Sequence, residues 1–350
     1  MEGRLTLADV EELAAAEMDP YWFAFLTGGA GAERTLRANV AAFALWRLRQ
    51  RVLCGIETVS TAVTLLGHDA GSPVVVAPVA YQRMAHPDGE EALARAAAAT
   101  GSPYCLSTFS TATAAEVAAA APGALRFLQV YVFRDHGVTD ELIAEALDAG
   151  FSAVFLTVDL PVVGSRDRER RVGWTFPHES LPSVRRAVAA GLTGENLALV
   201  DPALDWGYLE RLASAVPVPV VVKGVLDPDD AVLAAEHGAA GVVVSNHGGR
   251  QLDAVMPTLE ALPPIVDAVG DRIEVLFDGG IRRGSDVATA LALGARAVLA
   301  GRLPIWGLAA GGENGAREVL ELVREEVGTA LHLMGCDSPA ALTRSSLVAA

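Results

Sequence analysis

Residues 245–253 read SNHGGRQLD and directly follow the apolar run GVVV. They place Asn246, His247 and Arg250 around two glycines. An imidazole can accept and donate a proton near neutral pH, and a guanidinium can bind a carboxylate through two parallel hydrogen bonds. A chain that needs only a turn requires none of these groups. The segment therefore predicts a site where a proton is moved on an anionic ligand.

A lone histidine is more often a structural residue than a catalytic one, so the surroundings of His247 decide its interpretation. Asp159 ends another apolar run, AVFLTVD, and is available to orient the imidazole ring. This setting favours His247 as a general base. The remaining histidines lack such a setting and are interpreted as structural or surface residues.

Eight short apolar runs alternate with alanine-rich helical stretches from residue 74 onward. They occupy residues 74–77, 104–108, 126–131, 153–159, 219–224, 241–247, 274–280 and 297–302. Nearly continuous apolar strands are typical of a parallel sheet covered on both faces, and eight such units close a barrel. A doubly wound open sheet is the alternative, but no early GxGxxG motif supports it. The sequence predicts an α/β fold, a (β/α)8 TIM barrel.

The pattern predicts one domain over residues 1–350, with extensions on the barrel. Its parts are residues 1–70 with two helical stretches and a strand pair around 58–67 that cap the barrel, the barrel at 74–310, and C-terminal helices at 311–350. The gap between the fourth and fifth strands, from 159 to 219, is too long for an ordinary connection. We interpret it as a lid over the active site.

In such a barrel the C-terminal ends of the strands form the catalytic face. The residues expected there are Pro78, Ala80, Ser107, Thr108, Gln129, Tyr131, Thr157, Asp159, Lys223, Ser245, His247, Arg250, Asp278, Gly279, Gly280, Gly301 and Arg302. Glycines at the last two strands, with Arg282 and Arg302, predict a phosphate site, because backbone N–H groups and guanidinium forks both bind phosphate oxygens. Lys223 remains open between a snorkelling side chain, a Schiff-base lysine and a fixed cation.

Composition excludes several classes of partner. The formal net charge of −16 disfavours nucleic acid and anionic membranes. The three cysteines lack CxxC spacing, so neither a disulfide framework nor a metal site is expected. The acidic start MEGRLTLADVEELAAA does not resemble a signal peptide, and no apolar run reaches the ~18 residues of a membrane helix. A cytoplasmic protein is expected.

Several motifs together resemble the FMN-dependent 2-hydroxy acid oxidases and dehydrogenases, which include glycolate, lactate and mandelate enzymes. These motifs are SNHGGRQLD, APVAYQRMAHPDGE, LQVY, LTVD, VKG and DGGIRRGSDV, and the resemblance runs from about residue 20 to 340. It implies FMN binding by Ala77, Pro78, Val79, Ala80, Ser107, Gln129, Thr157, Lys223, Ser245, Asp278 and Gly279, with the phosphate on Gly280, Arg282, Gly301 and Arg302. Lys223 would then be a fixed cation beside the flavin ring.

The resemblance also implies a reaction. His247 would take a proton from the substrate while electrons pass to the flavin, and Asp159 would stabilise the imidazolium that forms. Arg166 and Arg250 would bind the substrate carboxylate, and Tyr131 its hydroxyl. An (S)-2-hydroxy acid would be oxidised to the 2-oxo acid with oxygen as acceptor, in a homotetramer.

The sequence departs from this family in positions that bear on substrate. Phe25 stands where many members have a tyrosine, and Glu169, Val172 and Trp174 stand where Asp, Asn and Phe are commoner. Phe25 and VAPVAYQR look more like hydroxymandelate oxidases, which predicts an aromatic acid such as mandelate or 4-hydroxymandelate. Trp174, Phe176 and Tyr81 would line its pocket.

Four alternatives remain open at this point. One is an oxidase or dehydrogenase of small aliphatic acids such as lactate or glycolate. The others are an FMN barrel acting as an isomerase, an aldolase using Lys223, and a flavin-binding protein without turnover. The colour of the purified protein and its bleaching by a 2-hydroxy acid separate them.

Overall fold

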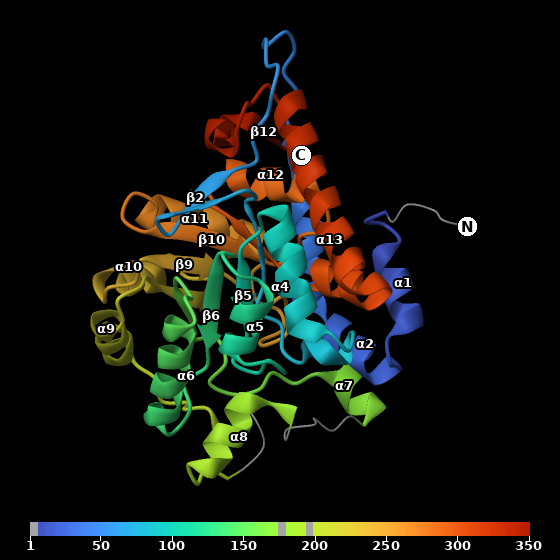
Figure 1. Ribbon diagram of the computed structural model, residues 1–350. Helices are drawn as coiled ribbons and strands as arrows, with labels where there is room; N and C mark the ends of the chain where they lie inside the picture. The colour runs from blue at the N-terminus through green and yellow to red at the C-terminus, as the bar shows by residue number, and fades with distance from the viewer. Residues whose placement is uncertain (1–5, 174–179, 194–198) are drawn as a thin grey trace.

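A computed structural model describes residues 6–173, 180–193 and 199–350 of the chain. Eight parallel strands close into a barrel in the order β10-β11-β4-β5-β6-β7-β8-β9, surrounded by helices (Figure 1). The strands are β4 (Val74–Val76), β5 (Tyr104–Leu106), β6 (Arg126–Val130), β7 (Val154–Thr157), β8 (Val220–Val225), β9 (Gly241–Val244), β10 (Glu274–Asp278) and β11 (Val298–Ala300). All eight lie within the predicted runs, apart from Val225 at the end of β8, and the predicted (β/α)8 barrel is confirmed.

Two apolar layers hold the barrel together, because successive strand residues point to opposite faces. The inner cluster includes Val75, Phe127 and Phe155, whose side chains fill the barrel. Their neighbours along each strand belong to a second, outer cluster. The second cluster contains Val76, Leu128 and other residues that pack beneath the helices. Strands buried on both faces explain why the runs read as continuously apolar.

The helices that cover the barrel follow the strands in order. They are α4 (Gly89–Thr100), α5 (Ala114–Ala120), α6 (His136–Asp148), α9 (Trp206–Ala215), α10 (Pro228–Glu236), α11 (Thr258–Val269), α12 (Gly284–Ala292) and α13 (Arg302–Leu333). The last helix is kinked at Gly311 and Gly312, where the backbone leaves helical geometry. It packs along α4 and α1 (Val10–Glu17).

The N-terminal extension contains three α-helices where the sequence predicted two helical stretches: α1, α2 (Pro20–Thr27) and α3 (Arg34–Ala41). The prediction missed one because α3 buries polar side chains, Thr35 and Asn39. The Asn39 amide exchanges two hydrogen bonds of 2.8 Å with the Asn246 amide. An apolar periodicity cannot reveal a helix that is buried through hydrogen bonds.

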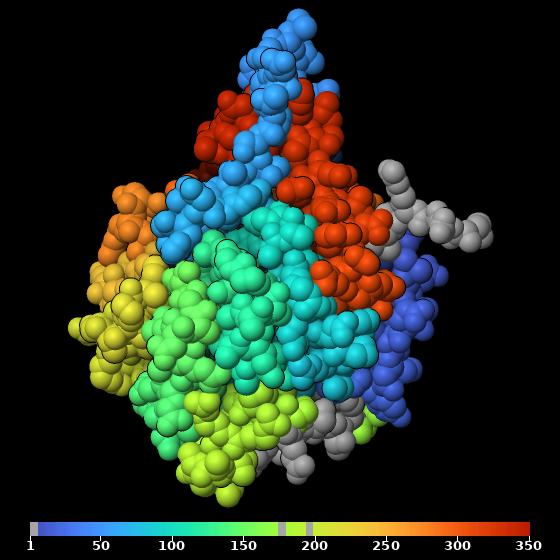
Figure 2. Space-filling model, in the orientation of Figure 1, coloured from blue at the N-terminus to red at the C-terminus, as the bar shows by residue number. Residues whose placement is uncertain are grey.

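The amino end of the barrel is closed by the expected strand pair, β2 (Val63–Leu65) and β3 (His68–Ala70). Leu65 and Leu66 enter the inner apolar cluster, and the Leu66 N–H donates to the Glu274 carboxylate at 3.0 Å. Residues 49–62, which precede β2, form the blue projection at the top of Figure 2.

The C-terminal segment differs from the predicted helices. After α13 it contains two short 3-10 helices (Pro339–Ala341 and Arg344–Ser346) and then β12 (Leu347–Ala349), which pairs antiparallel with β1 (Trp46–Leu48). Each strand has three residues, too few for a period of two to be recognised.

The predicted lid contains α7 (Asp167–Val172) and α8 (Pro182–Ala189), which lie at the end of the molecule opposite β2 (Figure 1). Helix α7 packs against α2. Trp174 and Phe176, expected to line the substrate pocket, lie outside the described residues. Within the described ranges, no helix has the length and apolar character needed to cross a membrane.

Candidate active site

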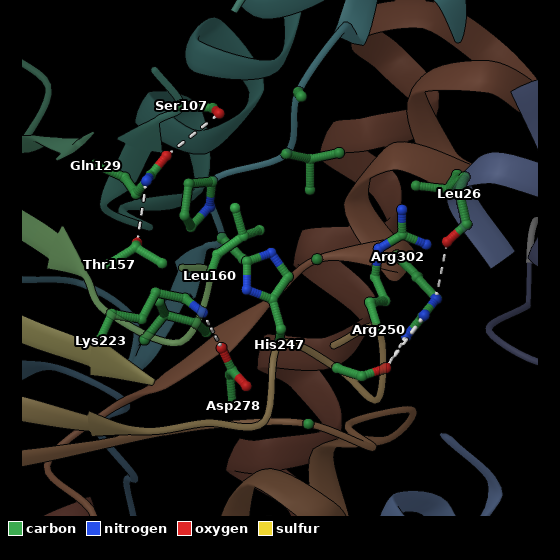
Figure 3. Close-up of a pocket in the computed structure, with 18 of the residues that line it drawn as sticks. Leu26, Ser107, Gln129, Thr157, Leu160, Lys223, His247, Arg250, Asp278 and Arg302 are labelled. Atoms are coloured by element: carbon green, nitrogen blue, oxygen red, sulfur yellow. Dashed lines mark hydrogen bonds and ion pairs between the residues drawn. The ribbon is translucent and has the colours of Figure 1, made fainter. Parts of the chain in front are cut away.

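A cavity of about 490 Å³ opens at the C-terminal ends of the barrel strands. The predicted site residues along its wall are Phe25, Ala77, Pro78, Val79, Ala80, Ser107, Gln129, Tyr131, Thr157, Arg166, Lys223, His247, Arg250, Asp278, Gly279, Gly280, Arg282, Gly301 and Arg302. Asp159 and Ser245 are not part of the wall. They lie one layer behind it, in contact with His247 and Lys223 respectively. Figure 3 shows the centre of this group.

The polar layer follows from strand geometry. Gln129 and Thr157 come two residues after the inward-facing Phe127 and Phe155, so they point to the same interior. The same spacing relates Lys223 to Val221 and Asp278 to Leu276. The interior therefore changes from apolar to polar at one level of the barrel.

Hydrogen bonds join this layer on one side of the barrel. Ser107 Oγ donates to Gln129 Oε1 at 3.3 Å, and Gln129 Nε2 donates to Thr157 Oγ1 at 3.0 Å (Figure 3). All three side chains are buried. Their orientation is thereby fixed, and they present a row of polar atoms to the cavity.

Lys223 is held as a fixed cation next to this row, on the strand beside Thr157. Its Nζ lies 3.0 Å from Asp278 Oδ2 and donates to Ser245 Oγ at 2.9 Å. Burial alone favours a neutral amine, but Asp278 and Asp159 outweigh it, and the pKa of Lys223 lies above its ordinary value. A protonated amine is not a nucleophile, so this geometry disfavours the Schiff-base alternative.

His247 lies between a carboxylate and a phenol. Its Nδ1 is 2.9 Å from Asp159 Oδ1, and its Nε2 is 3.3 Å from Tyr131 Oη. Burial lowers the pKa of His247, and Asp159 offsets this only in part. The imidazole is therefore neutral at pH 7, with Nδ1–H donating to Asp159 and the Nε2 lone pair available to a ligand.

Arg166 and Arg250 meet at the same cavity. Arg166 Nε donates to the Arg250 carbonyl oxygen at 3.2 Å. Arg250 Nη1 donates to the carbonyl oxygens of Phe25 and Gly28 at 2.5 and 2.8 Å, and its Cζ lies 4.7 Å from the Phe25 ring centroid. Burial, followed by the charge of Arg166, lowers the pKa of Arg250 well below its ordinary value. The two side chains form a buried cationic pair.

A second cationic group lies where β10 and β11 end. Burial and the charge of Arg282 lower the pKa of Arg302 to about 10. Neither arginine has a carboxylate ion pair within the described ranges. Arg302 donates instead to the carbonyl oxygen of Leu26 (Figure 3) and to those of Gly28 and Gly248. Helix α13 begins here at Arg302, and its N-cap residue, Gly301, has no side chain to cap the helix. The region suits a dianion such as a phosphate.

Gly280 has a reason to be glycine besides anion binding. Its φ is +80°, and a Cβ atom there would clash with the carbonyl oxygen of Asn39 on α3. The glycine is therefore required by packing, and its backbone also lines the cavity.

Comparison with known proteins places this site in a family. The profile of the family described as FMN-dependent dehydrogenase matches residues 14–349. The chain belongs to the FMN-dependent dehydrogenase family. It is an oxidoreductase with FMN as its cofactor.

Relatives in this family carry different substrate names. An L-lactate oxidase from Nostoc sp. is 42% identical, covering 95% of this chain and 94% of its own. Human 2-hydroxyacid oxidase 1 is 39% identical, with 95% and 94% coverage. The crystal structure of mandelate oxidase with benzoyl-formic acid matches with a TM-score of 0.90 at 42% identity, covering 99% of each chain.

Sequence reasoning missed part of the cavity wall, including Phe109, Leu160 and Val163. Each follows a predicted strand end by a few residues, a signal that was available in YCLSTFS and TVDLPVVG. The carbonyl oxygens of α2 that bind Arg250 and Arg302 could not be predicted in this way. Every residue type carries a backbone carbonyl group, so the sequence does not mark which ones accept these bonds.

Proposed function

We propose that this protein oxidises an (S)-2-hydroxy acid to the 2-oxo acid, with FMN as cofactor and oxygen as the final acceptor. The observation that carries the proposal is a neutral, Asp-paired His247 in the same cavity as the buried Arg166 and Arg250. The names of the relatives, which act on 2-hydroxy acids, support this class of substrate. Two electrons and two protons leave the acid, and oxygen becomes hydrogen peroxide.

The residues at the cavity suit FMN in chemistry. Arg282, Arg302 and the start of α13 would hold the phosphate, because both arginines are half-buried without a carboxylate partner in the described ranges. Lys223 and the Gln129 row would bind the polar edge of the ring. Asp278 Oδ1 is buried with no hydrogen-bond partner and lines the same cavity, which suits a further donor there. When bound, FMN supplies the two-electron acceptor that side chains lack.

The protein's own groups would bind and orient the substrate. Arg166 and Arg250 would bind its carboxylate, and Tyr131 Oη would donate to its hydroxyl oxygen. His247 Nε2 would take the proton, and Asp159 would stabilise the resulting imidazolium.

The deciding experiment is anaerobic mixing of the yellow holoprotein with (S)-2-hydroxy acids. We expect the visible absorption band of the flavin to bleach on the stopped-flow timescale and to recover when oxygen is admitted. A yellow protein that no 2-hydroxy acid bleaches contradicts the proposal and supports a binding protein without turnover. Recovery only with another acceptor contradicts the oxygen assignment alone.

The pH dependence is a separate prediction. Because only neutral His247 accepts a proton, kcat/KM should fall at acid pH, with its limb below the ordinary histidine pKa of ~6.5. In Asp159→Asn the carboxylate that raises this pKa is absent, so the limb should move to still lower pH. The plateau should fall about tenfold, since a charged hydrogen bond exceeds a neutral one by roughly 1–1.5 kcal/mol. A limb that moves to higher pH in the variant would contradict the pairing.

We further propose that the preferred acid carries an aromatic ring. The cavity wall includes the apolar groups of Phe25, Tyr81, Phe109, Leu160 and Val163. Phe25 packs edge-on against Tyr81, with ring centroids 6.1 Å apart. A small acid would leave this apolar wall uncovered, whereas a ring buries apolar area at about 25 cal/mol per Å². Similarity to mandelate oxidase structures supports the same substrate.

We predict a kcat/KM for (S)-mandelate or 4-hydroxymandelate at least about tenfold above those for (S)-lactate and glycolate. Phe25→Tyr should move the preference toward the small acids, because its hydroxyl makes the wall more polar and so weakens binding of an aromatic ring. A hydrogen bond from this hydroxyl to the carboxylate, worth about 1 kcal/mol, would be gained by every acid alike. Steady-state kinetics on the four acids test this. A parent enzyme that prefers either small acid contradicts the aromatic assignment.

A further inference from the structure

The two arginines proposed to bind the substrate carboxylate already share a carboxylate of the protein. Glu169 Oε1 lies 3.3 Å from Arg166 Nη1 and 3.3 Å from Arg250 Nη2. The Glu169 side chain is 13% exposed and lines the same cavity. An internal carboxylate therefore occupies the geometry that an acid ligand would take.

Each nitrogen of the Arg166 guanidinium makes one hydrogen bond. Its Nε donates to the Arg250 carbonyl oxygen, and its Nη2 donates to Gln251 Oε1 at 3.3 Å, which leaves Nη1 to Glu169. Arg250 Nη1 is held by the carbonyl oxygens of Phe25 and Gly28, and its Nη2 by Glu169. An incoming carboxylate that binds Arg166 Nη1 and Arg250 Nη2 therefore competes with Glu169 for these two groups.

Charge and position make this contact exchangeable. Glu169 lies in the first turn of α7, a helix of six residues without a buried side chain, next to the lid residues that precede α8. One carboxylate, that of Glu169, is shared by the two guanidiniums. The cluster of Arg166, Arg250 and Glu169 therefore carries a net charge of about +1. The net positive charge attracts a monocarboxylate ligand, and exchange of the Glu169 carboxylate for that of the ligand conserves the hydrogen bonds of the two arginines.

We propose that Glu169 is a built-in competitor for the carboxylate site, which an acid ligand replaces at Arg166 Nη1 and Arg250 Nη2. This proposal rests on the proposed function, since it takes these arginines as the carboxylate site. It assigns Glu169 a role in setting ligand affinity and charge preference.

The test is the affinity of the FMN holoprotein for benzoate, a monocarboxylate without the hydroxyl needed for oxidation, measured by perturbation of the flavin spectrum. In Glu169→Gln the amide oxygen still accepts from an arginine, but the competing charge is gone. We expect benzoate to bind about tenfold more tightly or better, the scale of one charge-assisted hydrogen bond. Asp167→Asn, which removes the same charge from the same turn, should leave the affinity within about twofold, since Asp167 is not part of the cavity wall.

Each outcome has a distinct meaning. An unchanged or weaker affinity in Glu169→Gln overturns the competitor role, and weakening identifies Glu169 as a residue that positions the arginines. Equal tightening in both variants overturns it too, because the effect is then general electrostatics. If the parent binds no carboxylate and no 2-hydroxy acid bleaches it, the proposed function itself has failed. If the parent binds benzoate and is bleached by a 2-hydroxy acid, the proposed function stands, and a negative result in Glu169→Gln contradicts only the role of Glu169.

Discussion

Replacing His247 by asparagine is expected to lower kcat/KM by about 10²–10⁴-fold while FMN stays bound, the range for losing a positioned general base. Asparagine is the preferred substitution because His247 has a φ of +58°, a left-handed conformation that asparagine tolerates better than alanine. Its amide cannot accept a proton at neutral pH. The rate of anaerobic flavin reduction, measured by stopped flow, isolates the step in which the base acts.

His136 provides a matched control. Its Nε2 lies 2.8 Å from Asp201 Oδ2, so it repeats the histidine–aspartate pair outside the cavity wall. His136→Asn should leave the reduction rate within about twofold, because this pair touches no proposed ligand group. A His247→Asn enzyme that retains FMN and is reduced at a rate close to the parent rate would contradict the base assignment.

Much of the barrel was predictable because one physical rule governs it. Strands covered on both faces must be apolar throughout, and each apolar run therefore marked a strand. The same rule makes the first polar residue on the inner face, such as Gln129 or Lys223, mark the mouth of the barrel. The polar layer could be predicted from the sequence because the barrel interior tolerates polar groups only where they bind one another or a ligand.

Other features depend on contacts that no local pattern encodes. Helix α3 is fixed by the Asn39–Asn246 amide pair, which joins residues 207 positions apart. Arg302, predicted to bind phosphate, also donates to the Leu26 carbonyl oxygen, an acceptor that every residue type carries. Glu169 was identified only as a departure from the family, since its contact with both arginines depends on how α7 folds back over the cavity.

Arg250→Met is expected to lower kcat/KM for a 2-hydroxy acid by about ten- to a hundredfold, because a charge-assisted hydrogen bond to the carboxylate contributes roughly 1.5–3 kcal/mol. The corresponding 2-hydroxy amide lacks the anion and should lose much less, so the ratio of acid to amide activity should fall. Arg250 also binds the carbonyl oxygens of Phe25 and Gly28 at the end of α2. Part of any loss therefore comes from a displaced α2, and this part affects acid and amide alike.

Arg168→Met separates the two effects. Arg168 also ties the lid to α2, through Thr27 at 3.1 Å, and to the start of α3, through Glu33 at 2.7 Å, but it is not part of the cavity wall. Loosening α2 in this way should lower both activities together and leave their ratio unchanged. If Arg250→Met lowers the two activities by the same factor, as Arg168→Met should, Arg250 holds α2 in place and does not bind the substrate carboxylate. A fall in the ratio in Arg250→Met alone assigns the carboxylate to this guanidinium.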